Sequence, residues 1–471
     1  MQGTERALPA GLMRPSFLVV LGAALGLAAF VATPARADVP SIRVMTLTDA
    51  LAWGRAHQPA IRAAMARVAA QQEEARIPRS EWLPSVGATA QGFAASANNS
   101  TGTYVGAPYM DIPRIGGTRT AIPGSALPYA TTFVGAGINQ EVFDFGRIAA
   151  RAAAADALVD VVRQRAAVER LDVDFSIEEA YFAVFSARSV LRAAEEAEAR
   201  ARVHRDLAKA GVDAGLRAPV VLTRAEADLA RFGIARERAR AGVLVAQSVL
   251  AATVGVPEPG LDVAGDAPST REMPSLSDAV RDAASRDPYI LEAEARVRAE
   301  EKGTRAIAAE LRPDLSLTST LSLRGGGAPP SGAGSVGVGL PNVPNYDVGL
   351  VLRWPIFNGP VAARERASRA REQVRREELG VVRFARSTAV QQAYLAVGVA
   401  KAALPALERA LVAARANYDQ AEARFRSGLA DAVELADAEA LRTQAEIDLI
   451  IGRFDLARAR VAFGRTIAEE R

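Results

Sequence analysis

The feature that most constrains this chain is an internal duplication. The segment Leu-Thr-Asp-Ala-Leu at 47–51 returns as Leu-Ser-Asp-Ala-Val at 276–280, an offset of 229 (276 − 47). Further along, Gly-Leu at 215–216 returns as Gly-Leu at 428–429, an offset of 213 (428 − 215). The offset changes because a Gly- and Pro-rich insert is longer in the first copy than in the second. Whatever unit one half of the chain forms, the other half should form again.

Both copies predict the same order of elements: helix, strand, loop, strand, long helix, tight turn and helix. The first repeat is expected at 38–260, with a helix, a β-hairpin at about 85–143, a long helix at 147–211 and a helix at 217–253. The second is expected at 261–471, with a helix at 276–310, a β-hairpin at about 314–357, a long helix at 361–426 and a helix at 430–468.

The hairpins show the period-two alternation of β-strands. It is clearest at 315–323 and 346–354, where apolar residues alternate with small or polar ones. No other strand is predicted in either repeat, and a lone hairpin is marginally stable in water. These strands therefore need partners from other chains or from lipid. Their length and alternation are typical of outer-membrane strands, which predicts an oligomeric outer-membrane barrel.

The helices are unusually long for a compact domain. The stretch at 147–211 contains no proline, and at 1.5 Å per residue it would span roughly 100 Å. Its counterpart contains Pro405, where we expect a kink or a break. The shorter helices, placed end to end, approximately match the long one, so two could stack alongside it. The junctions between helices and strands are marked by Pro84, Pro313, Asp144 and Asn358.

The N-terminus predicts export. Arg6 and Arg14 supply positive charge, an apolar run follows at 17–31, and Ala35-Arg36-Ala37 is a small-x-small cleavage site. We therefore expect a signal peptide at 1–37, starting at Met1 or at Met13. No later segment has the roughly 18 consecutive apolar residues of a membrane helix.

Composition excludes several functions. The chain has no cysteine, which excludes disulfides, a thiol nucleophile, cysteine zinc sites and a lipid-modified N-terminal cysteine. The net charge is only +3 and the arginines are interleaved with acids, so nucleic acid binding is not indicated. The Arg-rich stretch at 364–376 is balanced by glutamates and predicts a solvated helix face.

We find no catalytic constellation, and we predict neither an enzyme nor a cofactor. Gly332, Gly334 and Gly337 match the dinucleotide pattern, but a hairpin loop with prolines follows them where a nucleotide site needs a helix. The two histidines, His57 and His204, lie in different helical patterns. Each is interpreted as a helix-surface residue.

The chain with these features resembles the TolC family of outer-membrane efflux channels. The resemblance covers nearly all of the chain after 1–37. It rests on the duplicated helix–hairpin–helix–helix plan, on the Phe-Asp/Asn-x-Gly junction between strand and long helix, and on the Gly-Leu turns between helices. Two departures are Pro219, close after the first turn, and the lack of a lipidation cysteine.

The resemblance implies a mainly α fold with transmembrane β-structure in a homotrimer. Each protomer would give four strands to a twelve-stranded barrel, which continues into a long periplasmic α-helical barrel. It also implies a cell outer-membrane location with a large periplasmic portion. The tips Gly215-Leu216 and Gly428-Leu429 would dock to a periplasmic adaptor (membrane fusion) protein and an inner-membrane pump.

The second turn is followed by three acids. Asp431, Glu434 and Asp437 share one helix face, and Asp431 is placed to cap the helix. In a trimer they would surround one axis, and acidic rings favour cations in a pore. The first copy has Ala218, Val221 and Arg224 at these positions, so the turn itself does not require acids. We predict that the acids line the periplasmic constriction and that Arg224 helps to close it.

The functional prediction is a passive exit duct of a tripartite pump that exports small molecules. One alternative is the outer-membrane channel of type I protein secretion. A second, from another class, is a periplasmic coiled-coil adaptor or scaffold without a barrel, against which the two alternating hairpins argue. The sequence leaves the substrate, the pump class and the resting state of the gate open.

Overall fold

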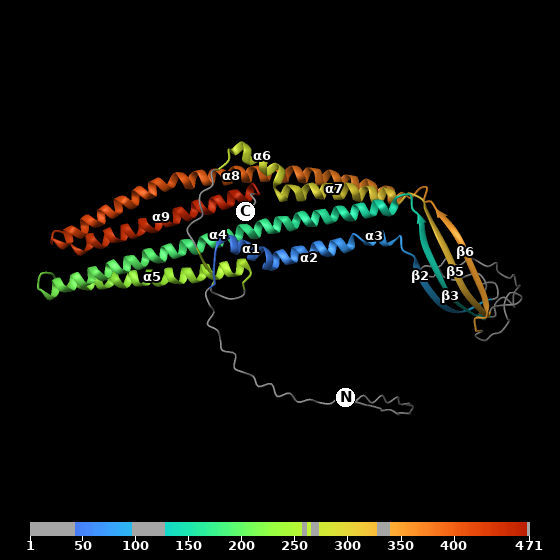
Figure 1. Ribbon diagram of the computed structural model, residues 1–471, viewed down its shortest axis with the longest axis horizontal. Coiled ribbons are helices and arrows are strands. Elements are labelled where there is room, and N and C mark those ends of the chain that lie inside the picture. The colour runs from blue at the N-terminus through green and yellow to red at the C-terminus, as the bar shows by residue number, and fades with distance from the viewer. Residues whose placement is uncertain (1–42, 97–127, 257–260, 265–272, 327–339, 469–471) are drawn as a thin grey trace, which may run out of the picture. The chain divides into compact units, whose positions relative to one another are not determined.

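A computed structural model describes five parts of the chain: 43–96, 128–256, 261–264, 273–326 and 340–468. All five lie within one compact unit, Ile42–Arg471, shown in Figure 1. The signal peptide expected at 1–37 and the Gly-rich match at 332–337 lie outside the described residues.

The first repeat holds eight described elements. They are β1 (Arg43–Met45), α1 (Leu47–His57), α2 (Pro59–Glu74), α3 (Ile77–Ser80), β2 (Ser85–Ser96), β3 (Pro128–Phe143), α4 (Arg147–Asp213) and α5 (Pro219–Val254). The second repeat holds β4 (Leu261–Val263), α6 (Leu276–Arg286), α7 (Pro288–Ala309), β5 (Asp314–Gly326), β6 (Val343–Arg353), α8 (Gly359–Arg426) and α9 (Ala432–Thr466).

The single helix expected over 276–310 is wrong, because α6 ends before Pro288 and α7 begins at it. Asp287 between them is extended, with ψ 116°, since a residue before proline is pushed out of the helical region. The first copy breaks in the same way at Gln58, before Pro59. At Pro405, by contrast, no break occurs, and α8 is one continuous helix.

The expectation of no strand outside the hairpins is also wrong. β1 and β4 form a parallel pair in which Arg43 lies opposite Leu261 and Met45 opposite Val263. The side chains of Leu261 and Val263 are buried in a core cluster with Ile177 of α4. A strand of three residues is too short to show a period, so no periodic pattern predicted it.

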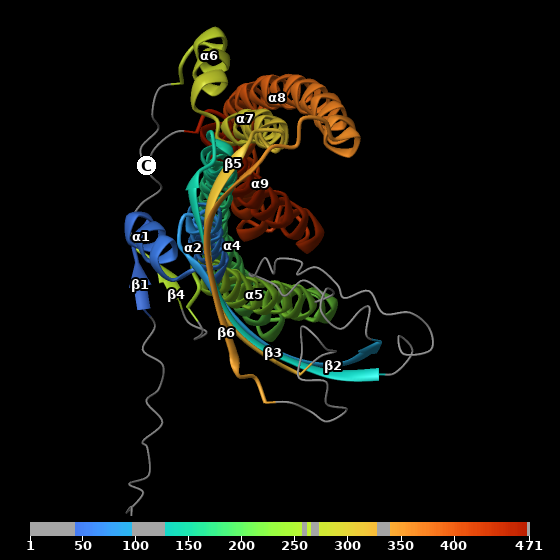
Figure 2. The same ribbon diagram turned by 90° about the vertical axis from the view of Figure 1, so that its right-hand side faces the viewer.

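The four long strands form one antiparallel sheet in the order β2-β3-β5-β6, which curves strongly (Figure 2). Several of its polar side chains are buried and many of its apolar side chains are exposed, which is the reverse of the arrangement in a water-soluble protein. On β5, Ser316, Thr320 and Ser322 are buried, whereas Leu321 is 65% exposed. On β6, apolar side chains such as Leu350 are exposed as well. This is the polar-in, apolar-out pattern of strands that face lipid.

The long helices form two antiparallel hairpins, α4 with α5 and α8 with α9 (Figure 1). The shorter α1 and α2 pack against α4, and α7 packs against both α4 and α8. Many buried positions are alanines, which allow close helix approach. No helix in the described parts of the chain is long and apolar enough to cross a membrane.

Backbone caps fix where α4 and α8 begin. For α8, Asn358 Oδ1 accepts from the backbone N–H of Val361 at 3.4 Å, as expected. For α4 the cap residue is Gly146, with φ 87°, in place of the expected Asp144. Asp144 instead lies two residues earlier and accepts from the backbone N–H groups of Gly146 and Ile148.

Candidate gate at the helical tips

Both helical hairpins turn through the same motif. We call residues 214–218 the first tip and 427–431 the second tip. Gly215 and Gly428 have φ 70° and 78°, a left-handed conformation that glycine adopts without strain. The backbone N–H of Leu216 donates to Gly211 O, and that of Leu429 to Arg424 O, each at 2.8 Å, as in a Schellman motif.

This geometry leaves a leucine at each apex. Leu216 is 82% exposed and Leu429 is 74% exposed. Exposed leucines are unremarkable singly, but here the same residue lies at the same place in both repeats. The two tips therefore present matched apolar contacts at the far end of the hairpins from the sheet (Figure 1).

The three predicted acids occupy different environments. Asp431 caps α9 by accepting from the backbone N–H groups of Val433 and Glu434, both at 2.9 Å. Glu434 lies 3.3 Å from Arg424 across the second tip. Asp437 is exposed and forms no ion pair with any described residue of the protomer. One acid thus has a capping role, one is paired on the surface, and one is free.

Arg224 lies on the exposed face of α5. Among the described residues it forms no ion pair, so a single protomer does not bring it to the acids. If Arg224 closes the gate, its carboxylate partner must come from another copy of the chain.

The structure adds a set of contacts that the sequence did not reveal. We call it the seam: it joins α4 and α5 to α8 and α9 near the tips. At its outer end, Arg217 of the first tip donates to Phe425 O at 2.6 Å. Its guanidinium also lies 3.6 Å from the Phe425 ring centroid. This cation–π contact and hydrogen bond tie the first tip to the last turn of α8, next to the second tip.

Further along the seam, a buried ion pair connects the hairpins. Arg200 of α4 donates to both carboxylate oxygens of Glu439 on α9, at 2.9 and 3.1 Å, and lies 3.5 Å from Glu446. Glu439 is only 2% exposed. Burial raises the pKa of Glu439, while the nearby Arg200 charge opposes that rise.

Between these two contacts lies His204, whose interpretation as a helix-surface residue is wrong. Its Nε2 shares a hydrogen bond of 2.8 Å with the Tyr418 hydroxyl of α8, and the two rings meet edge to face. Burial lowers the pKa of His204 and raises the pKa of Tyr418 to about 12. Both groups are therefore neutral at pH 7.

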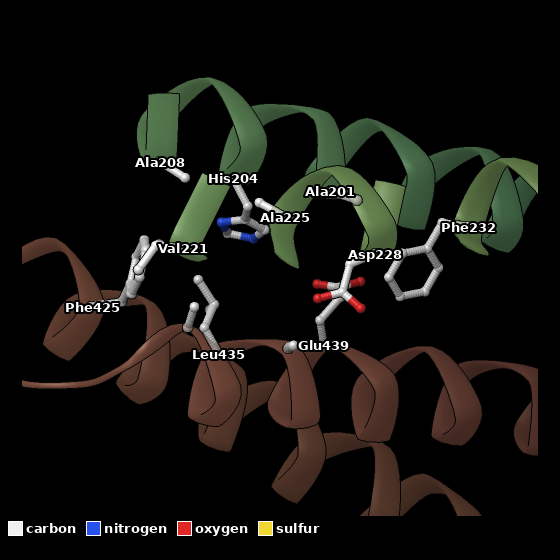
Figure 3. A pocket seen from close by; sticks show the side chains of 12 residues that line it. Ala201, His204, Ala208, Val221, Ala225, Asp228, Phe232, Phe425, Leu435 and Glu439 are labelled. Atoms are coloured by element: carbon white, nitrogen blue, oxygen red, sulfur yellow. The ribbon is translucent and has the colours of Figure 1, made fainter. Parts of the chain in front are cut away.

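His204 also lines a small cavity between the hairpins (Figure 3). The cavity has a volume of about 40 Å³, which is room for a few water molecules and no larger ligand. His204 points into it from α4, and Leu435 and Glu439 point into it from α9. In the described parts of the chain, no group of three His, Cys, Asp or Glu side chains could hold a metal ion.

One sequence signal could have found the seam. Glu439 lies on the apolar face of α9 between Leu435 and Leu449, which are both buried. A carboxylate on such a face must find a partner on the neighbouring helix. The identity of that partner, Arg200, depends on how two segments more than 200 residues apart in sequence come together.

The family model described as outer membrane efflux protein matches residues 54–256 and 279–467. The chain belongs to the outer membrane efflux protein family. This confirms the resemblance and identifies the protein as an outer-membrane efflux protein.

Other relatives of this efflux protein agree in sequence or fold. Protein CyaE of Bordetella pertussis is 28% identical over 84% of this chain and 78% of its own length. The outer-membrane channel OprN matches with a TM-score of 0.69 at 22% identity, over 90% of each chain. A membrane protein from Pseudomonas aeruginosa matches with a TM-score of 0.70 at 20% identity, over 91% of each chain. The last two likenesses establish the fold.

Proposed function

We propose that this family member forms a homotrimer that acts as a passive exit duct for small molecules, gated at the periplasmic tips. The observation that carries the proposal is the sheet. Among the described strands, β2 and β6 each pair on one side only, and most exposed side chains of β6, such as Val348, Leu350 and Leu352, are apolar. Unpaired edges that face lipid would be costly, and three copies would close them into a barrel.

We further propose that the constriction of this duct lies at the acids after the second tip. Asp437 and Glu434 are both exposed, and three copies would bring their carboxylates together around one axis. A carboxylate ring in a water-filled pore attracts cations and repels anions. The exposed Arg224 of a neighbouring copy would neutralise part of this charge in the closed state.

Planar-bilayer recordings of the double variant Glu434→Ala/Asp437→Ala test this proposal. We expect a reduced cation preference, measured as a smaller reversal potential in a KCl gradient, together with a higher open probability. Glu73→Ala, an exposed carboxylate on α2, is the control for loss of one surface charge. Wild-type selectivity and wild-type closure in the double variant would contradict the assignment.

Partners follow from the same geometry. We propose that Leu216 and Leu429 dock the channel to a periplasmic adaptor (membrane fusion) protein and, through it, to an inner-membrane pump. Six such leucines in a trimer would offer a ring of apolar contacts.

We also propose the export route. A signal peptide at 1–37 is cleaved after Ala37, and the two repeats at 38–260 and 261–471 follow it.

A second candidate function is the outer-membrane channel of type I protein secretion. The similarity to Protein CyaE, at 28% identity, supports this alternative. Deletion of the gene distinguishes the two candidates. Increased sensitivity to small toxic compounds is expected for an efflux duct, whereas loss of one secreted protein without such sensitivity is expected for a secretion channel.

A further inference from the structure

We propose that His204 makes the seam a proton-sensitive latch, so that acidification favours separation of the two helical hairpins of a protomer. This inference rests on the proposed gating at the tips and adds a regulatory signal to it. It starts from the position of the imidazole, which lies between the Arg217–Phe425 contact and the Arg200–Glu439 pair.

The hydrogen bonding of His204 accommodates only a neutral ring. Nε2 shares one hydrogen bond with Tyr418. Nδ1 is shielded from solvent and has no hydrogen-bond partner among the described residues. A protonated imidazole carries a proton on both nitrogens and needs two acceptors. The packed seam offers one, so protonation leaves a buried donor unsatisfied, whereas separation of the hairpins exposes it to water.

The carboxylates that face the imidazole are already paired with arginines, among them Asp228 with Arg231 at 3.4 Å and Glu439 with Arg200 at 2.9 Å. Glu422 of α8 favours the charged ring, but it is paired with Arg426 at 2.7 Å, and Arg200 disfavours the charged ring. Burial is the largest influence and lowers the pKa of His204. The charged and titratable groups that face the imidazole are Arg200 of α4, Asp228 of α5, Tyr418, Glu422 and Arg426 of α8, and Glu439 of α9.

The direction of the pH effect follows from linkage. In the separated state the imidazole returns toward its ordinary pKa of about 6.5, so that state binds more protons near pH 6 than the packed state does. Lower pH therefore favours separation, by at most about tenfold per pH unit for one histidine. Glu439 acts in the opposite sense, because burial raises its pKa and its protonation stabilises the packed seam.

The absence of cysteine permits a direct measurement. Ala214 and Ser427 are exposed and occupy equivalent places in the two tips. Ala214→Cys and Ser427→Cys, spin-labelled in one protomer of a full-length trimer in nanodiscs, report the distance between the tips by pulsed electron paramagnetic resonance. Between pH 7.5 and 5.5 we expect the longer-distance population to rise at least about threefold.

Four variants on this labelled background separate the causes. His204→Gln should remove the response, while His57→Gln, which changes the other histidine, should retain it. Tyr418→Phe should weaken the seam at both pH values and keep the response, because burial of the imidazole remains. Glu439→Gln should keep or enlarge the response.

The outcome that overturns the latch is an unchanged pH response in His204→Gln, or no response in the wild type. Conductance of the same samples separates this failure from failure of the proposed function. A trimer that conducts ions with a pH-independent tip distance contradicts the latch alone. A trimer that conducts at no pH contradicts the exit duct itself.

Discussion

At the scale of single residues, the seam depends on charges that are buried and paired. Arg200 is the central group, because it contacts Glu439 and lies close to Glu446. An ion pair of this kind adds little net stability compared with well-packed apolar residues. Removal of one partner is costly, however, since the other charge is left without compensation in the protein interior.

Arg200→Ala should therefore weaken the seam by about 3–5 kcal/mol near pH 7.5, seen as faster hydrogen exchange in the tip-proximal parts of α4 and α9. On the His204→Gln background, lower pH should partly restore protection, because a protonated Glu439 needs no cationic partner. Arg202→Ala is the matched control two residues away. Arg202 is exposed, and its partner Glu198 at 3.1 Å keeps a second arginine, Arg236, at 2.7 Å, so this loss should cost less than about 1 kcal/mol. Equal effects of the two variants would argue against the buried pair.

At the scale of the elements, the two hairpins are built alike and differ in what surrounds their tips. Both end in a left-handed glycine followed by an exposed leucine. Only the second tip is followed by acids, and Asp431 caps α9, whereas α5 begins at Pro219 without a side-chain cap. Proline at the first helical position costs little, which explains how the first tip forms without an acid.

Leu429→Asp should abolish drug resistance in a cell that depends on this channel, while trimer assembly in the outer membrane stays intact. The physical reason is that a charge in place of an exposed leucine opposes an apolar contact with the adaptor and leaves the core untouched. Ser427→Asp adds the same charge two residues away without removal of the leucine, and should retain resistance. Full resistance in Leu429→Asp would exclude this tip as the docking site.

At the scale of the whole molecule, one protomer leaves large apolar surfaces uncovered. Along α8, exposed apolar side chains recur at helical spacing, namely Val374, Val381, Phe384, Leu395 and Val399. A stripe of this kind on a soluble helix indicates a helix partner. In a trimer the neighbouring copy would supply it, as it would supply partners for the edges of the sheet.

Phe384→Asp should reduce the trimer fraction at least about tenfold, because burial of a phenylalanine stabilises each interface by roughly 1.5–3 kcal/mol and a buried aspartate opposes it. Native mass spectrometry of the detergent-extracted protein measures the ratio of trimer to monomer. Phe384→Leu keeps an apolar side chain and should remain trimeric. A trimeric Phe384→Asp protein would place this stripe outside the subunit interface.

Much of the architecture is encoded locally and was therefore predictable. The duplication, the period-two strands, the uninterrupted helical pattern and the Gly-Leu turns act over a few residues each, and together they led to the correct family. The breaks before Pro59 and Pro288 were also marked locally, although they were not recognised as helix ends. By contrast, the β1–β4 pair joins segments 218 residues apart (261 − 43) and left no periodic trace.

The candidate gate also combines features that local residues encode with contacts that only helix packing creates. The tips, the cap by Asp431 and the contrast between acidic and acid-free turns were predicted from local residues, because helix ends and caps depend on neighbouring residues. Helix packing, in contrast, brings Arg200 to Glu439, Arg217 to Phe425 and His204 to Tyr418. Each of these pairs joins residues more than 200 positions apart, and such pairs form only when two helices pack in one particular register.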